Sequence, residues 1–198
     1  MLIQLSTVKN RLGIPELDTT NDALIDALIA AVSARFDREC NRTLARTLDF
    51  AQEFPADRTE ISLACYPVET VTRFDLKFSE TEGWLEQAGI DYLLRSRCVL
   101  SLSSALSPQR SLLSPALARV IYTGGYVLPG TTPDPGQTAL PADVAQAAVE
   151  QTAWWFQNRD RLGLVSIWEY HSTYRHFTDF DLLTPVKAVL KRHERWGI

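Results

Sequence analysis

The sequence predicts an α+β fold that is mainly α: a helical bundle with a small antiparallel β-sheet insert and a C-terminal helix. Three features predict it. Apolar residues repeat with a helical period across residues 22–41, the period changes to two across residues 44–126, and a wide apolar helix follows over residues 141–158. The length of 198 residues is enough for one domain with an appendage. We therefore expect a core over residues 1–160 and a C-terminal extension over residues 161–198.

The N-terminal segment predicts two helices. The first covers residues 6–12, with Ser6 as its cap and Gly13 and Pro15 to end it. The second covers residues 22–41 and has apolar side chains at every fourth position. This stripe consists of Leu24, Leu28, Val32 and Phe36. We expect the stripe to pack against the later helix.

Residues 44–126 predict the antiparallel sheet. Ile61, Leu63 and Cys65 alternate with small or polar residues, and turn-forming residues separate several such runs. The pair Gly124-Gly125 follows the last predicted strand. Neither a glycine-rich dinucleotide motif nor a lysine-bearing phosphate loop follows, so this pair predicts a tight turn.

A proline-rich loop connects the sheet to the helix over residues 141–158. Proline disrupts helices and inner strands, so residues 128–140 predict an exposed loop. Its length exceeds that of ordinary connections, and such loops are commonly functional or disordered. The following helix carries two adjacent apolar stripes, one on Val144, Ala148 and Trp155, and it should pack against more than one neighbour. The last helix is predicted to start at Pro185 with Thr184 as its cap.

Composition excludes several classes of protein. The chain has 20 Lys and Arg against 24 Asp and Glu, and a net charge of −4 argues against a dedicated nucleic-acid binder. No apolar run approaches the length that spans a bilayer, and the N-terminus lacks the pattern of a secretory signal, so we expect no membrane association. Cys40, Cys65 and Cys98 are widely spaced and odd in number, which predicts free thiols. No cofactor-binding motif is present, and we expect no cofactor.

One cluster near the C-terminus suggests chemistry. His171, His176, Asp179 and Asp181 lie within eleven residues and could ligate a metal ion. Their spacing matches no known metal motif, so a solvated or interfacial strip is the competing interpretation. Two alternative function classes therefore stay open: a metal-binding or small-ligand enzyme that uses this strip, and a generic helical scaffold or toxin–antitoxin-type binding module.

The order of these signals resembles the head–tail connector (adaptor or head-completion) proteins of long-tailed bacteriophages and related gene-transfer particles. Five segments carry the resemblance. They are residues 5–36 with a short helix before a long one, Tyr66-Pro67-Val68-Glu69-Thr70-Val71, Glu82-Gly83 with Asp91-Tyr92-Leu93, Arg119 to Tyr126 followed by Leu140-Pro141-Ala142-Asp143-Val144 and Ala153 to Arg159, and Leu183 to Leu190. The chain departs from the family in a longer, more aromatic segment over residues 162–181 and in a C-terminal helix that continues to Ile198.

The resemblance implies a structural virion protein and not an enzyme. It implies a homo-oligomeric ring of twelve subunits at the head–tail junction, assembled in the host cytoplasm. Its partners would be the portal protein and a tail or stopper protein, and double-stranded DNA would pass through the ring without specific binding.

Two surfaces are expected to make these contacts. The first is the C-terminal stretch, which should dock onto the portal through Val186, Val189, Leu190, Lys191, Arg192, Arg195, Trp196 and Ile198. The second is the proline-rich loop, which should lie at a subunit or channel surface with Pro129, Gly130, Pro133, Pro135 and Gly136.

Overall fold

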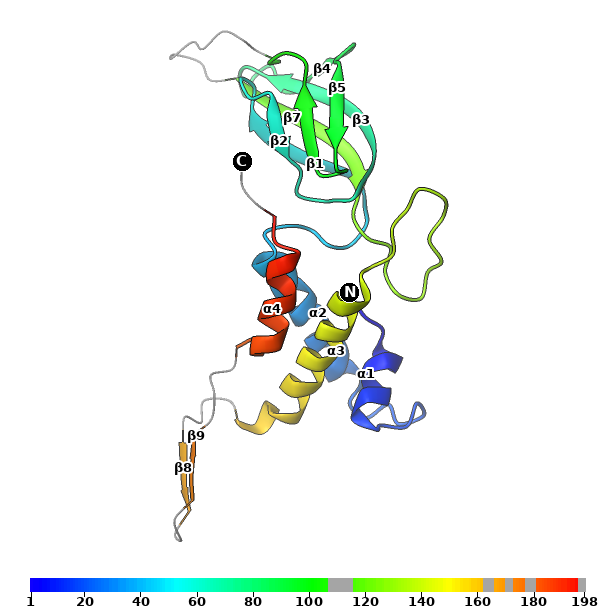
Figure 1. Cartoon of the computed structure of the whole chain (residues 1–198), viewed down its shortest axis with the longest axis vertical. Helices are drawn as coiled ribbons and strands as arrows, with labels where there is room; N and C mark the ends of the chain where they lie inside the picture. Colours follow the sequence, from blue (N-terminus) through cyan, green and yellow to red (C-terminus); the bar gives the residue numbers. More distant parts are fainter. Residues whose placement is uncertain (107–115, 162–165, 170–172, 177–180, 196–198) are drawn as a thin grey trace. The chain divides into compact units, whose positions relative to one another are not determined.

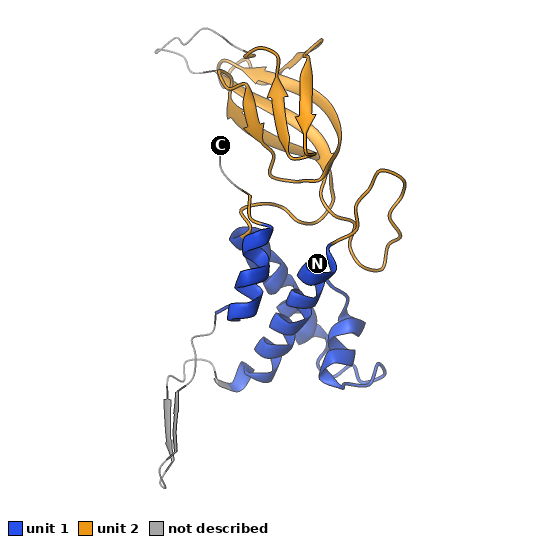
Figure 2. Ribbon diagram, in the orientation of Figure 1, with its two compact units in different colours: residues 1–39, 141–193 blue, residues 40–140, 194–198 orange. Residues whose placement is uncertain are grey.

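The computed structural model describes residues 1–106, 116–161, 166–169, 173–176 and 181–195. The chain divides into two compact units, which Figure 2 distinguishes by colour. The helical unit comprises residues 1–39 and 141–193, and the β unit comprises residues 40–140 and 194–198.

The described part of the helical unit contains four α-helices. They are α1 (Leu5–Leu12), α2 (Asp22–Glu39), α3 (Ala142–Gln157) and α4 (Thr184–Arg192), and a 3-10 turn, η1 (Arg159–Arg161), follows α3. Helix α3 is the central element because it contacts α1, α2 and α4 (Figure 1). These three neighbours explain the wide apolar face that the sequence of α3 presents. Between η1 and α4 the chain forms an antiparallel hairpin of β8 (Ser166–Glu169) and β9 (Thr173–His176).

The buried face of α2 differs from the predicted stripe at two of its four positions. Ile25, Ile29, Val32 and Phe36 are almost completely buried. Leu24 is 40% exposed and Leu28 is only partly buried, so the prediction that these two leucines belong to the buried stripe is wrong. The N-terminal half of α2 offers two neighbouring apolar stripes, and the helix turns the isoleucine stripe inward and leaves Leu24 toward solvent.

The helix ends also differ from the predicted caps. Helix α1 begins after Gln4 without a side-chain cap, so Ser6 does not cap it, and Gly13 ends the helix with a left-handed φ of 70°. Helix α4 begins at Thr184 after Leu183, which places Pro185 within the first turn, where its missing N–H leaves no unsatisfied donor.

The β unit contains two antiparallel sheets within the described residues. The first has the strand order β1 (Thr47–Pro55), β7 (Leu117–Gly124), β3 (Val68–Lys77) and β4 (Leu85–Gln87). The second has the order β2 (Glu60–Ser62), β6 (Val99–Leu102) and β5 (Tyr92–Arg95). Strands β1 and β3 both pair with β7, so β7 lies at the centre of the larger sheet.

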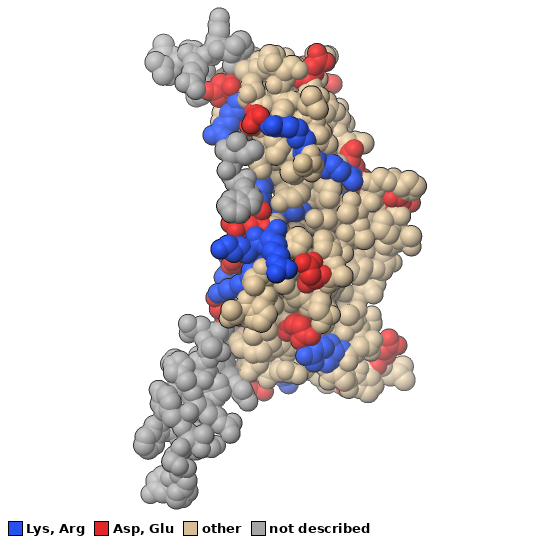
Figure 3. All heavy atoms as spheres, in the orientation of Figure 1, with Lys and Arg blue, Asp and Glu red and all other residues tan. Residues whose placement is uncertain are grey.

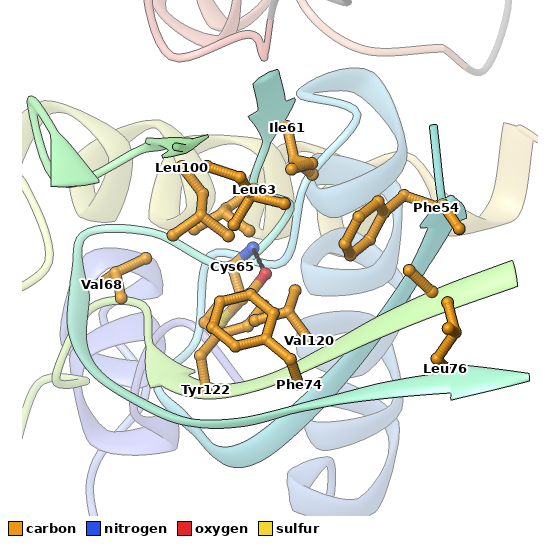
Figure 4. Close-up of a cluster of buried hydrophobic side chains, with 13 residues drawn as sticks. Phe54, Ile61, Leu63, Cys65, Val68, Phe74, Leu76, Leu100, Val120 and Tyr122 are labelled. Carbon is orange, nitrogen blue, oxygen red and sulfur yellow. Dashed lines mark hydrogen bonds between the residues drawn. The ribbon is translucent and has the colours of Figure 1, made fainter. Parts of the chain in front are cut away.

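Side chains from both sheets share one apolar core (Figure 4). Its buried members include Phe54, Leu63, Phe74, Leu100 and Val120, which come from four strands and the β2–β3 connection. Every residue of this cluster lies between positions 54 and 122. The β unit therefore has a core of its own.

The prediction of a mainly helical fold is wrong. The described structure is 32% helical and 28% strand, an α+β fold in which the sheets are as substantial as the helices. Four strands of the two sheets, β2, β4, β5 and β6, have only three or four residues, which is too short to display a period of two clearly, so the sequence pattern understates the sheets. The region expected to be a lateral insert in a bundle forms a separate compact unit.

A buried hydrogen-bond network holds the β2–β3 connection against the larger sheet. The hydroxyl of Tyr122 accepts from the backbone N–H of Cys65 (3.0 Å; Figure 4). It also accepts from the N–H of Ala64 (3.1 Å) and donates to Gln52 Oε1 (3.1 Å). Gln52 also accepts from the N–H of Ala64 and donates to the carbonyl of Ser62. Burial raises the pKa of Tyr122 to about 12, which keeps the hydroxyl neutral and able to donate.

Gly124 and Gly125 lie where three backbone segments converge. A Cβ on Gly124 would lie 2.5 Å from the carbonyl oxygen of Cys65, and one on Gly125 would lie 2.6 Å from that of Ala45. Gly125 also has a φ of 100°. The pair is required by close backbone packing at the end of β7, as the prediction of a turn suggests, and not by a ligand.

Candidate assembly surfaces

The proline-rich loop is exposed, but its two ends are joined to each other. The N–H of Val127 donates to the carbonyl of Thr138 (2.8 Å), and the N–H of Leu140 donates to the carbonyl of Val127 (2.9 Å). Residues 129–136 are all exposed. In Figure 1 the loop projects from the end of β7 as an open hairpin-like turn of chain.

Short-range hydrogen bonds give the loop a defined backbone. The N–H of Thr131 donates to Leu128 O (3.3 Å), and the N–H of Gln137 donates to Asp134 O (3.0 Å). The Gln137 side chain accepts in return from the N–H of Asp134 (3.0 Å). The expected residues Pro129, Gly130, Pro133, Pro135 and Gly136 thus lie together on one exposed, hydrogen-bonded loop.

The Arg97 side chain fastens the far side of this loop to the sheets. Its guanidinium donates to the carbonyl of Gly136 (2.6 Å), to Oγ1 of Thr138 (3.4 Å) and to the carbonyl of Val68 (3.1 Å). Arg97 lies 39 residues before Gly136 in the turn between β5 and β6. Nothing in the sequence points to this role, since an arginine in a polar turn is ordinary.

The turn that carries Arg97 has an unusual backbone. Ser96 and Arg97 have φ angles of 49° and 55°, in the left-handed region that favours glycine or asparagine. The N–H of Cys98 donates to the carbonyl of Arg95 (3.1 Å) and closes a β-turn with Ser96 and Arg97 as its central residues. This geometry aims the guanidinium of Arg97 at the loop.

The expected portal-docking residues separate into three groups. Val186 and Leu190 are 3% and 2% exposed and lie in the interior of the helical unit, and Val189 is half-buried. Lys191 and Arg192 are exposed. Arg195 belongs to the β unit, where its backbone N–H donates to the carbonyl of Cys40 (2.8 Å). Trp196 and Ile198 lie outside the described residues.

Polar contacts fix α4 onto α3 in one position. The buried side chain of Gln151 accepts from the N–H of Leu183 (2.8 Å) and donates to the carbonyl of Asp181 (3.3 Å). At the other end of α4, His193 Nε2 lies 3.1 Å from Asp143 Oδ2. Both ends of α4 are therefore tied, and the exposed basic residues have a fixed platform.

Ion pairs hold the carboxylates of this region in their charged form. Burial acts to raise the pKa of Asp143, but the hydrogen bond and charge of His193 outweigh it and the pKa is lowered. The hydrogen bond from Lys187 and that from the backbone of Leu182 lower the pKa of Asp181. The Arg11 side chain, hydrogen-bonded to both carboxylate oxygens of Glu150 at 2.9 and 2.8 Å, likewise lowers the pKa of Glu150 and links α1 to α3.

A charged and aromatic cluster covers the outer face of the larger sheet. Asp75 is 2% exposed and accepts from Arg119 at 2.5 and 2.9 Å, and Arg119 also lies over the ring of Trp84 at 4.3 Å. Arg73 lies 3.4 Å from the same carboxylate. The sequence analysis did not single out this cluster, because its members come from β3, β7 and the segment before β4.

The described residues do not bring together the side chains that the metal-binding alternative requires. Asp181 pairs with Lys187 and Arg35, His176 lies in β9, and His171 and Asp179 lie outside the described residues. Within the described ranges, no group of three or more metal-ligating side chains comes together.

The charge distribution is mixed. In the view of Figure 3, acidic and basic side chains are interspersed, with wide uncharged areas between them. None of the helices in the described ranges combines the length and apolar character needed to cross a bilayer.

Comparison with known proteins gives matches at the level of structure. No known family and no curated protein matches the sequence. A chain from the neck of an empty GTA particle computed with C6 symmetry has a TM-score of 0.59 at 16% identity, and the match covers 100% of this chain and 91% of that one. A chain from the virion of a native gene transfer agent (GTA) particle gives a TM-score of 0.57 with the same identity and coverage. The fold is one found in gene transfer agent particles.

The similarity is one of fold. The structural relatives are chains of gene transfer agent particles, and the first belongs to the neck of such a particle. Both matches span the helical unit and the β unit together, since they cover the whole chain.

Proposed function

We propose that this protein is a head–tail connector: a structural component of the neck of a phage or gene-transfer particle. Twelve copies form a ring that joins the portal to the next head-completion, stopper or tail protein and continues the DNA channel. It is located at the head–tail junction of the virion and in the host cytoplasm during assembly.

The observation that carries this proposal is the structural similarity over the whole chain to a neck component. The charge supports it as well. A channel wall should let DNA pass, and because each lysine or arginine contact with phosphate adds affinity, a net charge of −4 suits that role.

The portal-docking surface is assigned to the C-terminal end of α4. Val186 and Leu190 anchor the helix in its own unit, so the accessible contacts come from Lys191 and Arg192. Neither cation has an ion-pair partner among the described residues, and both are therefore available to acidic groups of a portal. The contribution of Arg195, Trp196 and Ile198 to portal docking stays a prediction from the sequence.

The experiment mixes purified protein with the portal protein encoded beside it and measures complex mass by light scattering and ring formation by electron microscopy. Arg192→Glu should weaken portal binding several-fold, whereas Arg58→Glu, the same charge change at an exposed position in the β unit, should not. Failure of the unaltered protein to form a ring with or without portal would refute the connector role. Equal binding by both variants would refute the assignment to α4.

A further inference from the structure

The proline-rich loop combines exposure with restraint. An exposed connection needs no fixed shape, yet residues 128–140 are held by hydrogen bonds at both ends and on the far side. Restraint of an exposed segment lowers the entropy lost on binding. A restrained loop of this kind is suited to recognition.

The restraint on the far side comes from a residue in an unfavourable conformation. Arg97 has a φ of 55°, where glycine or asparagine is favoured, and its three acceptors belong to Val68, Gly136 and Thr138. Glycine there would relax the turn but would remove the guanidinium. Backbone strain of this kind is concentrated at functional sites.

The chemistry of the loop favours a protein partner over DNA. Residues 128–140 contain no lysine or arginine, and their single charged side chain is the carboxylate of Asp134. The loop residues themselves therefore offer no cationic side chain to a nucleic-acid backbone. Threonine, proline and glycine make up most of the loop and suit a neutral protein contact.

We infer that the proline-rich loop is a contact between neighbouring copies of this chain, and that Arg97 is the positioning residue that holds it ready for that contact. This inference rests on the proposed ring and names one of its interfaces. A closed ring needs a head-to-tail contact in which one surface of each copy meets a different surface of the next. The loop is one such surface, and it lies in a different unit from the portal-docking end of α4.

The test compares Arg97→Gly with Ser96→Gly. Both substitutions place glycine at a left-handed position of the same turn, so their effect on the backbone is matched. Only Arg97→Gly also removes the guanidinium. Hydrogen exchange at Val127, Gln137 and Leu140 should accelerate at least tenfold in Arg97→Gly and stay unchanged in Ser96→Gly. Arg97→Lys should restore part of the protection. The ring-forming concentration should rise about tenfold for Arg97→Gly alone.

A photo-crosslinking amino acid at the exposed position Thr132 identifies the partner in assembled particles. A crosslink to a second copy of the chain supports the inference, and a crosslink only to portal or DNA overturns it. Unchanged exchange in Arg97→Gly, or normal ring formation with a loosened loop, also overturns it. If the unaltered protein forms no ring, the proposed function fails, while the exchange data still show whether Arg97 holds the loop.

Discussion

At the scale of single residues, the interior of the β unit depends on polar groups whose hydrogen-bonding capacity is satisfied within the protein. The Tyr122 hydroxyl makes three hydrogen bonds, two of them to backbone N–H groups that have little access to water. Leaving a buried donor without an acceptor removes more stability than an average hydrogen bond contributes. These contacts are therefore sensitive points in an otherwise apolar core.

Replacement of Tyr122 with phenylalanine should destabilise the β unit by about 1–3 kcal/mol. The reason is that Cys65 would lose the acceptor of its N–H, whereas Ala64 would keep Gln52. A urea titration with amide exchange measured in β7 gives the change. Tyr92→Phe, at a side chain that is 42% exposed, is the control and should leave the midpoint in place. Equal midpoints for both variants would contradict the assignment.

Residue-scale roles were the least predictable from sequence. The sequence predicts a turn at Gly124 and Gly125 because glycine pairs mark turns whatever the rest of the chain contains. No local pattern marks Arg97, Gln151 or Arg119, since their partners lie 29 to 44 residues away in sequence. Only the folded chain brings them together.

At the scale of elements, helices were predictable because their periods extend over many residues. The sequence pattern predicts the positions of α2 and α3 closely. It does not predict which of the two neighbouring apolar stripes on α2 is buried. That choice depends on the helices that contact α2, which a single sequence pattern does not specify. The short strands β2, β4 and β5 lack enough residues to display a pattern at all.

The observed face of α2 leads to a direct test. Ile29→Ala should destabilise the helical unit by about 2–5 kcal/mol, because Ile29 is 1% exposed and its removal leaves a cavity. Leu24→Ala, on the predicted but incorrect stripe, should change stability by no more than about 0.5 kcal/mol. Denaturant titration of both variants compares them, and a larger loss for Leu24→Ala would contradict the observed orientation.

The ion pairs of the helical unit predict sensitivity to acid. The pKa values of Asp143, Glu150 and Asp181 are lowered in the folded chain, so unfolding at acidic pH is accompanied by proton uptake. Their contribution is complete above the unfolded-state pKa of about 4 and is lost as pH falls through the lower folded values. Melting temperatures between pH 7 and pH 2.5 should therefore fall steeply below about pH 4.5.

Glu150→Gln should reduce this pH dependence, since it removes one of the three carboxylates and its pairing with Arg11. Glu16→Gln, an exposed glutamate in the α1–α2 connection, serves as the control. An unchanged acid slope in Glu150→Gln would show that its pairing with Arg11 contributes nothing measurable, as many exposed ion pairs do.

At the scale of the whole molecule, two cores are formed by one chain. Among the described residues, the buried cluster of the β unit lies between positions 54 and 122, and the helical unit uses segments on both sides of it in sequence. A fragment of residues 40–140 should therefore fold without the helices and unfold cooperatively in urea. A fragment of residues 1–39 should remain largely unfolded, because α2 lacks its contact with α3. A non-cooperative 40–140 fragment would contradict the independence of the β unit.

This arrangement sets an order of events during synthesis. As the chain leaves the ribosome, the buried face of α2 appears first but meets α3 only about a hundred residues later, after the whole β unit has emerged. Helix α4, whose end carries Lys191 and Arg192, is the last described helix to be made, and Gln151 fixes it only onto an α3 already in position. Under the proposed function, a chain whose synthesis stops before α4 would present a folded β unit without the proposed docking end. Such a chain could not bind the portal through α4, so the order of synthesis would limit assembly to subunits that have reached α4.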